Sequence, residues 1–392
     1  MVNQKLPELD MLRIVSILIV VIAIHIPLSY AYNFYVELNQ FGTFLVNNVG
    51  IYVAMGSFVF VSGFGLYLNP NNRKLNSSKK IFSFLKKRFI RIFPLYWIAI
   101  ILFLLFVGFP GYSPLYLMYH FFGLQMIVAP HFGGPMLTLW FIGLIVIYYL
   151  IYLILNTLGS IKLIIPASIL FLFFLVFLSG AFGLIEDRIF LYYSLFILGI
   201  IAASIYTSPL FNRIKDRLKK IHPAVLLLIP LCSAILGYMA FHYLTRFCFT
   251  SFIAEFGNYN LHFILQLNPD FFQLTSIIFR INLIIVAFII FTFSIFNVTF
   301  RALRLIFSKR KIESVVSVPA YSTYSVYLFH RVFLAIFITI LTTEYHINMT
   351  ERYNLYIVLL FVPFIFLFSY LIQKGIDGLW KLASRYVYKN NH

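Results

Sequence analysis

The chain has 392 residues, of which 62% are hydrophobic and 11% are charged, and its formal net charge is +18. Soluble proteins average about 45–50% apolar and about 25% charged residues, so this composition excludes a soluble globular domain. It predicts an all-α polytopic membrane protein, since helices satisfy their own backbone hydrogen bonds in lipid. Two cysteines, Cys232 and Cys248, provide neither a disulfide framework nor a metal-ligand spacing, so no metal is expected.

Ten apolar segments are long enough to cross a bilayer. They cover residues 11–31, 46–68, 92–109, 138–157, 162–179, 188–206, 223–243, 274–299, 320–342 and 354–374. No small-residue cleavage site follows the first of them, so we interpret it as a retained helix rather than a signal peptide. We expect residues 1–392 to form a single integral-membrane domain, within which 375–392 is a short basic cytoplasmic tail.

The charges of the connecting segments alternate along the chain. Lysine and arginine gather in 73–91, 213–220, 301–311 and 374–389. The opposite segments 32–45, 110–137, 180–187, 244–273 and 343–353 hold only two basic residues, Arg246 and Arg352, and most of them carry acidic ones. The positive-inside rule then puts both termini in the cytoplasm, which requires an even number of spans. We expect the protein to lie in the cytoplasmic membrane of the cell. The positive charge therefore reflects topology and does not indicate nucleic-acid binding. The aromatic outer segments 110–137 and 244–273 can be lids, re-entrant pieces or plain loops.

A single histidine, His25, lies deep in the first span. It follows Arg13 by twelve positions, and the residues between them carry no charge. At about 1.5 Å per residue it lies roughly 18 Å from Arg13, inside a hydrocarbon core about 30 Å thick. Ionisable groups at that depth are costly and mark functional sites by default, but a neutral histidine can also serve only to hydrogen-bond a neighbouring helix.

The basic segment 73–91 ends in a pair of arginines, Arg88 and Arg91. Residues three apart share a helix face, and two guanidinium groups on one face can hold phosphates bidentately. The alternative is that the cluster is only topogenic and contacts anionic lipid.

Further polar residues lie inside or at the ends of other spans. His330 and Arg331 fall near the middle of the ninth span, and Arg280 lies inside the eighth. A lipid-facing arginine there is too costly, so we expect an internal polar cavity, used for catalysis or for transport. Trp140, at an outer boundary, is typical of the aromatic belt, and Ser62 lies beside small residues that let helices approach closely.

The motifs resemble, in order along the chain, those of the membrane acyltransferase-3 family, whose members acylate extracytoplasmic glycans and other acceptors. The matching motifs are Asp10-x-x-Arg13 leading to His25, then Ser62-Gly63-Phe64, Arg88-x-x-Arg91-Ile92-x-Pro94-x-Tyr96, Leu139-Trp140-Phe141 and Ser325-Val326-Tyr327-Leu328-Phe329-His330. Ten spans with cytoplasmic termini also fit, so the resemblance covers nearly the whole chain.

The resemblance implies a role for each matching residue. The catalytic candidates are His25, Arg13 and Asp10, the donor-binding candidates are Arg88, Arg91, Tyr96 and Ser62, and the cavity candidates are Trp140, His330 and Arg331. The implied reaction takes an acyl group, acetyl by family frequency, from cytoplasmic acyl-CoA to a hydroxyl of a glycan or its lipid-linked precursor. His25 then acts as general base or as a transient acyl carrier, and no cofactor stays bound. The implied partners are acyl-CoA, the glycan or glycolipid acceptor and membrane lipid.

One spacing departs from the family pattern. The family usually has ten residues between the arginine and the histidine, and this chain has eleven between Arg13 and His25. On a regular helix eleven positions return to within about 20° of the start, whereas twelve leave the residues roughly 120° apart. Either a π-bulge absorbs the extra residue, or His25 does not share the face of Arg13.

A glycan transporter or flippase is the competing interpretation. It would use the same polar cavity and basic cytoplasmic face without any chemistry. Transporters commonly show inverted repeats with interrupted helices at matching positions, and this sequence shows none. The sequence therefore favours the enzyme.

Overall fold

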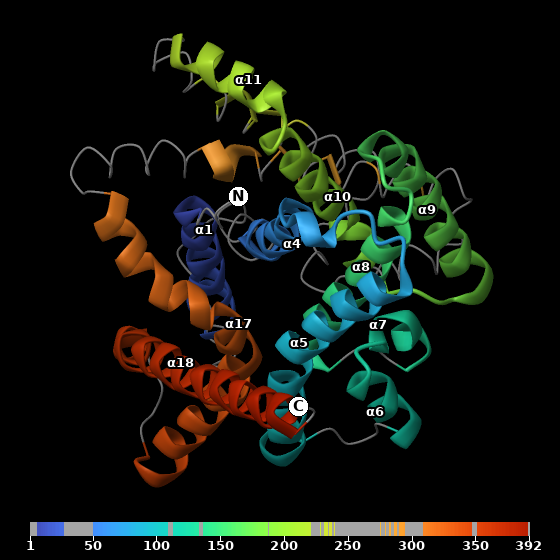
Figure 1. The fold of residues 1–392 in the computed structure, drawn as a ribbon. Coiled ribbons are helices and arrows are strands. Elements are labelled where there is room, and N and C mark those ends of the chain that lie inside the picture. The colour runs from blue at the N-terminus through green and yellow to red at the C-terminus, as the bar shows by residue number, and fades with distance from the viewer. Residues whose placement is uncertain are drawn as a thin grey trace. The chain divides into compact units, whose positions relative to one another are not determined.

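The structure is a computed structural model of the chain, and every regular element in its described part is a helix. The described residues are 6–26, 50–108, 113–132, 136–186, 188–220, 309–346 and 351–390, together with isolated positions between 228 and 294. Figure 1 shows the described helices as coloured ribbons. They group into two compact units, one with residues 1–46, 86–111 and 304–392 and the other with residues 47–85 and 112–303.

Five helices of the described part are long and apolar enough to cross a membrane. They include Ser78–Phe106, Ile161–Phe182, Arg188–Tyr206, Lys311–Glu344 and Ile357–Leu382, and two shorter apolar helices cover Val53–Leu68 and Trp140–Asn156. Each of the seven overlaps a span predicted from the sequence. The predicted spans 223–243 and 274–299 fall largely outside the described residues, and the outer segment 244–273 does so entirely. The described part of the chain is thus all-helical and contains several helices with the length and composition of membrane spans.

The first unit contains the beginning and the end of the chain. Helix α1 (Pro7–Leu18) starts with a proline in its first turn, where a missing N–H costs nothing. It continues directly into the π-helix η1 (Ile19–His25). Helix α17 (Lys309–Thr339) extends into a second π segment, and α18 (Glu351–Asn390) is one continuous helix. Helix α17 packs against both α1 and α18, and Figure 1 shows α17 and α18 crossing.

Helix α5 (Ser78–Phe106) begins within the basic segment, well before the span predicted at 92–109. Lysine and arginine are good helix formers, and the Ser77 hydroxyl accepts a hydrogen bond from the backbone N–H of Lys80, which caps the first turn. From Lys86 onward α5 belongs to the first unit. There the Tyr324 hydroxyl of α17 donates to the Ile92 carbonyl at 2.9 Å and ties the two helices together.

Close helix packing organises the second unit around α4 (Gly50–Leu68) and α10 (Arg188–Tyr206). A Cβ at Gly63 would collide with the backbone carbonyl of Phe196, and a Cβ at Gly199 would collide with that of Phe60. The small residues singled out in the second span thus let two backbones touch.

Tyrosine hydroxyls fix the neighbouring helices of this unit. Tyr148 of α8 (Trp140–Asn156) donates to the Ile189 carbonyl at 2.7 Å, and Tyr193 donates to the Ser168 carbonyl of α9 (Ile161–Phe182) at 2.7 Å. The unit also contains the short turn η3 (Pro70–Asn72), which follows α4, and α11 (Pro209–Lys220), which follows α10.

The described residues of segment 110–137 form short helices rather than an open loop. These are α6 (Pro114–Phe121), α7 (Gln125–Val128), η4 (Ala129–His131) and η5 (Leu137–Leu139). His120 is fully buried here: its Nδ1 lies 3.0 Å from the Tyr116 carbonyl, and its Nε2 accepts the Met136 N–H at 3.1 Å. Burial lowers the pKa of His120 to about 4.

Candidate functional site

Two histidines from opposite ends of the chain meet inside the first unit. His25 is the last residue of η1, and its Nδ1 lies 2.7 Å from Nε2 of His330 on α17. The ring centroids are 4.7 Å apart. The His330 side chain is fully buried, whereas His25 is half-buried. The structure therefore joins the principal catalytic candidate to one of the cavity candidates.

The π-helix explains how the chain accommodates its unusual spacing. The Ile26 N–H bonds to the Val21 carbonyl, five residues earlier. A π turn closes over one more residue than an α turn, so η1 holds more residues per turn than a regular α-helix. The π segment that the first alternative for the Arg13–His25 interval predicts is therefore present, and π segments occur frequently at functional sites.

The His330 ring is held by its own helix. Nδ1 of His330 lies 3.0 Å from the Val326 carbonyl and 2.8 Å from the Tyr327 carbonyl. The next residue, Arg331, is half-buried. The ring is thus fixed at both nitrogens, by backbone on one side and by His25 on the other.

Serine and glutamine side chains tie α17 to α18 one to two turns before His330. The Ser325 hydroxyl lies 2.6 Å from Gln373 Oε1 and 3.1 Å from the Ser369 carbonyl. These contacts satisfy polar groups that would be costly in an apolar bundle, and they join α17 to α18. The predicted cavity residue Arg280 lies outside the described residues.

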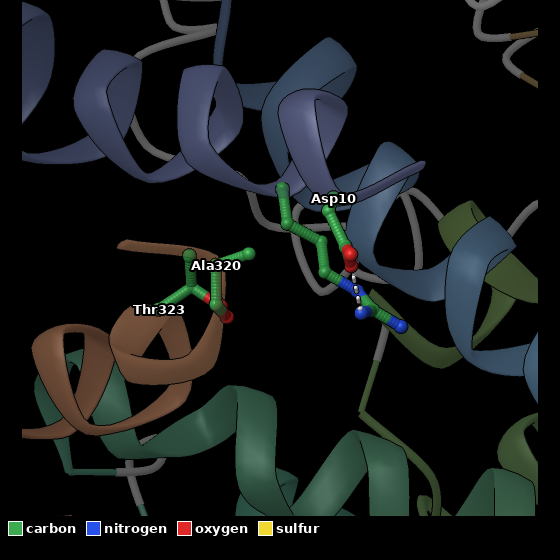
Figure 2. Close-up of polar contacts among 4 residues, drawn as sticks. Asp10, Ala320 and Thr323 are labelled. Atoms are coloured by element: carbon green, nitrogen blue, oxygen red, sulfur yellow. Dashed lines mark hydrogen bonds and ion pairs between the residues drawn. The ribbon is translucent and has the colours of Figure 1, made fainter. Parts of the chain in front are cut away.

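Asp10 and Arg13 form a pair of their own on α1. The Arg13 guanidinium donates to the Asp10 carboxylate at 2.9 Å (Figure 2). The two side chains are 31% and 26% exposed, so the pair contributes at most about 1 kcal/mol to stability. On α17, which packs against α1, the Thr323 hydroxyl donates to the Ala320 carbonyl (Figure 2). The ion pair between Asp10 and Arg13 thus contributes little to the stability of the protein, so stability alone does not account for the presence of these two charged residues.

The predicted donor-binding residues of the basic segment share one helix. Arg88 and Arg91 lie three residues apart on α5, so they share a face, as the sequence indicated. Arg88 is half-buried and Arg91 is exposed, while Tyr96 is fully buried on the same helix. A guanidinium pair that is partly accessible is suited to phosphate groups.

The two remaining candidates, Ser62 and Trp140, belong to the second unit. The Ser62 hydroxyl on α4 lies 3.1 Å from the Tyr149 hydroxyl on α8. This contact gives Ser62 a helix-packing role within that unit.

Trp140 has a partner that sequence reasoning missed. The Arg188 guanidinium lies over the indole ring at 4.7 Å, and the Tyr192 ring stacks at 6.0 Å. Glu186 holds Arg188 through an ion pair at 3.3 Å. The only sequence signal was the presence of Arg188 directly after the acidic residues of segment 180–187. Trp140 is thus half-buried in a polar and aromatic cluster.

Within the described residues, histidine, cysteine and acidic side chains do not gather in a group that could hold a metal ion. The chemistry available at the histidine pair is that of imidazole, which can accept a proton or attack an electrophile through an unprotonated nitrogen.

A family profile described as an acyltransferase domain, the family called acyltransferase-3, matches residues 6–374, which is nearly the whole chain. No curated protein and no solved structure matches the chain.

Proposed function

The chain belongs to the acyltransferase-3 family and is therefore an acyltransferase, and from this premise we propose a specific reaction. The protein moves an acyl group, acetyl in the first instance, from cytoplasmic acyl-CoA to a hydroxyl of an extracytoplasmic glycan or its lipid-linked precursor. The family assignment also sets the transporter interpretation aside.

The hydrogen-bonded pair of His25 and His330 carries the proposal. A histidine fixed by a second buried histidine, at the end of a π-helix, is a costly arrangement for helix packing alone. As general base, His25 takes the proton of the acceptor hydroxyl while the oxygen attacks the thioester carbonyl. The carbon–sulfur bond then breaks, and the leaving thiolate takes that proton from His25. As acyl carrier, an unprotonated nitrogen of His25 instead attacks the thioester carbon, and the carbon–sulfur bond breaks to release the coenzyme A thiolate. The acceptor oxygen then attacks the acyl carbon, the bond to His25 breaks, and the proton of the hydroxyl ends on the thiolate.

We assign binding of the acyl-CoA donor to Arg88 and Arg91. Arg88 and Arg91 would hold the phosphates of acyl-CoA bidentately, which their shared face and partial exposure support. Tyr96, which lies on the same helix as the arginine pair, joins the donor set by resemblance to the family. Asp10 would orient Arg13 through their 2.9 Å bond.

We also propose ten spans, both termini in the cytoplasm and residence in the cytoplasmic membrane, with residues 1–392 forming one integral-membrane domain. The alternating charge supports this topology. It is tested with Lys79→Cys in a background lacking Cys232 and Cys248. An impermeant thiol reagent added to intact cells should leave position 79 unlabelled, and labelling there would rule the topology out.

The experiment on function compares His25→Gln with His131→Gln. His131 is exposed and lies in η4, so its variant controls for loss of any histidine. Mass spectrometry of surface glycans should show O-acylation lost with His25→Gln and retained with His131→Gln. Protein level and binding of acetyl-CoA should stay near normal in both. Wild-type acylation by His25→Gln would refute the role of His25.

A further inference from the structure

The contacts of His330 determine where its proton lies. Its Nδ1 faces two backbone carbonyls, those of Val326 and Tyr327, at 3.0 and 2.8 Å. A carbonyl oxygen only accepts hydrogen bonds, so Nδ1 must carry a hydrogen. A cationic His330 is disfavoured, because the side chain is fully buried and Arg331 is its neighbour in the chain. The neutral ring therefore has an unprotonated Nε2.

The proton position of His25 follows from that of His330. An unprotonated Nε2 can only accept, and the atom facing it at 2.7 Å is Nδ1 of His25. Nδ1 of His25 must then be the donor, which leaves Nε2 of a neutral His25 with its lone pair free. We propose that His330 is a positioning residue that locks His25 in the Nδ1–H tautomer and so makes Nε2 the reactive nitrogen.

This inference rests on the proposed function and adds the direction of proton transfer to it. The acceptor hydroxyl gives its proton to Nε2 of His25 as its oxygen bonds to the acyl carbon. His25 then carries a hydrogen on both nitrogens and still donates from Nδ1 to His330. The departing thiolate takes the proton from Nε2, and His330 keeps its own proton throughout. His330 thereby does for His25 what the orienting member of a hydrolase triad does for its base.

Two substitutions at position 330 separate positioning from packing. Glutamine in His330→Gln can present an oxygen acceptor to His25, whereas leucine in His330→Leu fills space without any acceptor. The control is Ser325→Ala, which removes contacts between α17 and α18 but none to His25. Each variant is assayed in membranes as transfer of labelled acetyl from acetyl-CoA to the resident glycan.

If His330 no longer holds His25 in the Nδ1–H tautomer, kcat should fall while KM for acetyl-CoA stays within about twofold of the wild-type value. We expect His330→Leu to lose about 100- to 10,000-fold in kcat, by comparison with a triad whose base is held in the wrong tautomer. His330→Gln should stay within about tenfold of wild type, and Ser325→Ala should keep its kcat. Wild-type kcat in His330→Leu, or equal loss in His330→Gln and His330→Leu, would overturn the inference.

The tautomer of His25 can also be measured directly on the wild-type protein, and this measurement does not depend on the activity of any variant. Histidine labelled with ¹⁵N, in protein held in bilayers without substrate, reports the tautomer, and the His25 signals are those missing from His25→Gln. We expect a protonated Nδ1 and an unprotonated Nε2 at His25, and the opposite assignment contradicts the lock. If His25→Gln retains acylation, the proposed base role fails instead, and the tautomer measurement is unaffected.

Discussion

Gly63 of α4 lies directly against the backbone carbonyl of Phe196 on α10. Because backbone cannot move aside as a flexible side chain can, Gly63→Ala should destabilise the protein by about 1–3 kcal/mol. Gly65, two residues later, has nothing within 4 Å of its Cβ position. Gly65→Ala should therefore be neutral or stabilise the helix by about 0.5–1 kcal/mol. Thermal unfolding in detergent should show the difference, and equal melting temperatures for both variants would argue against this contact.

If Arg88 and Arg91 hold the phosphates of acyl-CoA bidentately, lysine cannot replace them. An ammonium group keeps the charge but lacks the planar fork of donors. The double variant Arg88→Lys, Arg91→Lys should raise KM for acetyl-CoA about tenfold or more, since each lost charge-assisted bond is worth about 1.5 kcal/mol or more.

The matched control changes two neighbouring lysines of α5 to arginine and so keeps the charge of that part of the helix. Lys86 and Lys87 are both exposed on α5, and Lys86→Arg, Lys87→Arg should leave KM unchanged. An arginine-to-lysine double variant that behaves like this control would mean that the segment acts through its charge alone.

His120 gives the fold a predicted sensitivity to acid. Its pKa is lowered to about 4 by burial, against about 6.5 in the unfolded chain. Between these values only the unfolded chain binds the proton, so stability is complete above pH 6.5 and falls as the pH drops towards 4. The loss reaches about 3 kcal/mol. Melting temperatures between pH 7 and 4 should fall less steeply for His120→Gln than for wild type, and parallel curves would exclude His120 as the cause.

The π-helix η1 predicts an asymmetry between deletion and insertion. Deleting Ile22 removes one residue from the segment that already absorbs one in excess, so an ordinary α-helix can restore the approach of His25 to His330. Inserting one alanine after Ile22 adds a second excess residue and should turn His25 away. Acylation in cells should survive the deletion in substantial part and be lost on insertion. Loss in both would show that the π geometry itself is required.

Most helices could be predicted from the sequence because bilayer thickness imposes a long apolar run on each span. Helix α5 starts before the predicted span because its lysine-rich beginning consists of good helix formers. The folded outer segment 110–137 could not be predicted. Its order depends on His120 reaching the Met136 backbone, sixteen residues away, which no local periodicity reveals.

The site was predicted as a set of residues rather than as an arrangement. His25 and His330 stood out because each lies at depth in a span, but nothing in the sequence indicated that they touch. Their contact depends on the packing of α1 against α17 and on the π-helix. Arg188 could not be identified from the sequence for a related reason: what distinguishes it is its contact with the Trp140 ring, which only the packing of the two helices produces.

The contact between His25 and His330 joins residues that are 305 positions apart. At about 5–20 residues per second, a ribosome needs roughly 15–60 s to extend the chain from one histidine to the other. The first helix therefore enters the membrane long before its partner exists, and no truncated product that ends before α17 can assemble the pair. Synthesis itself thus delays the appearance of the histidine pair until most of the protein has been made.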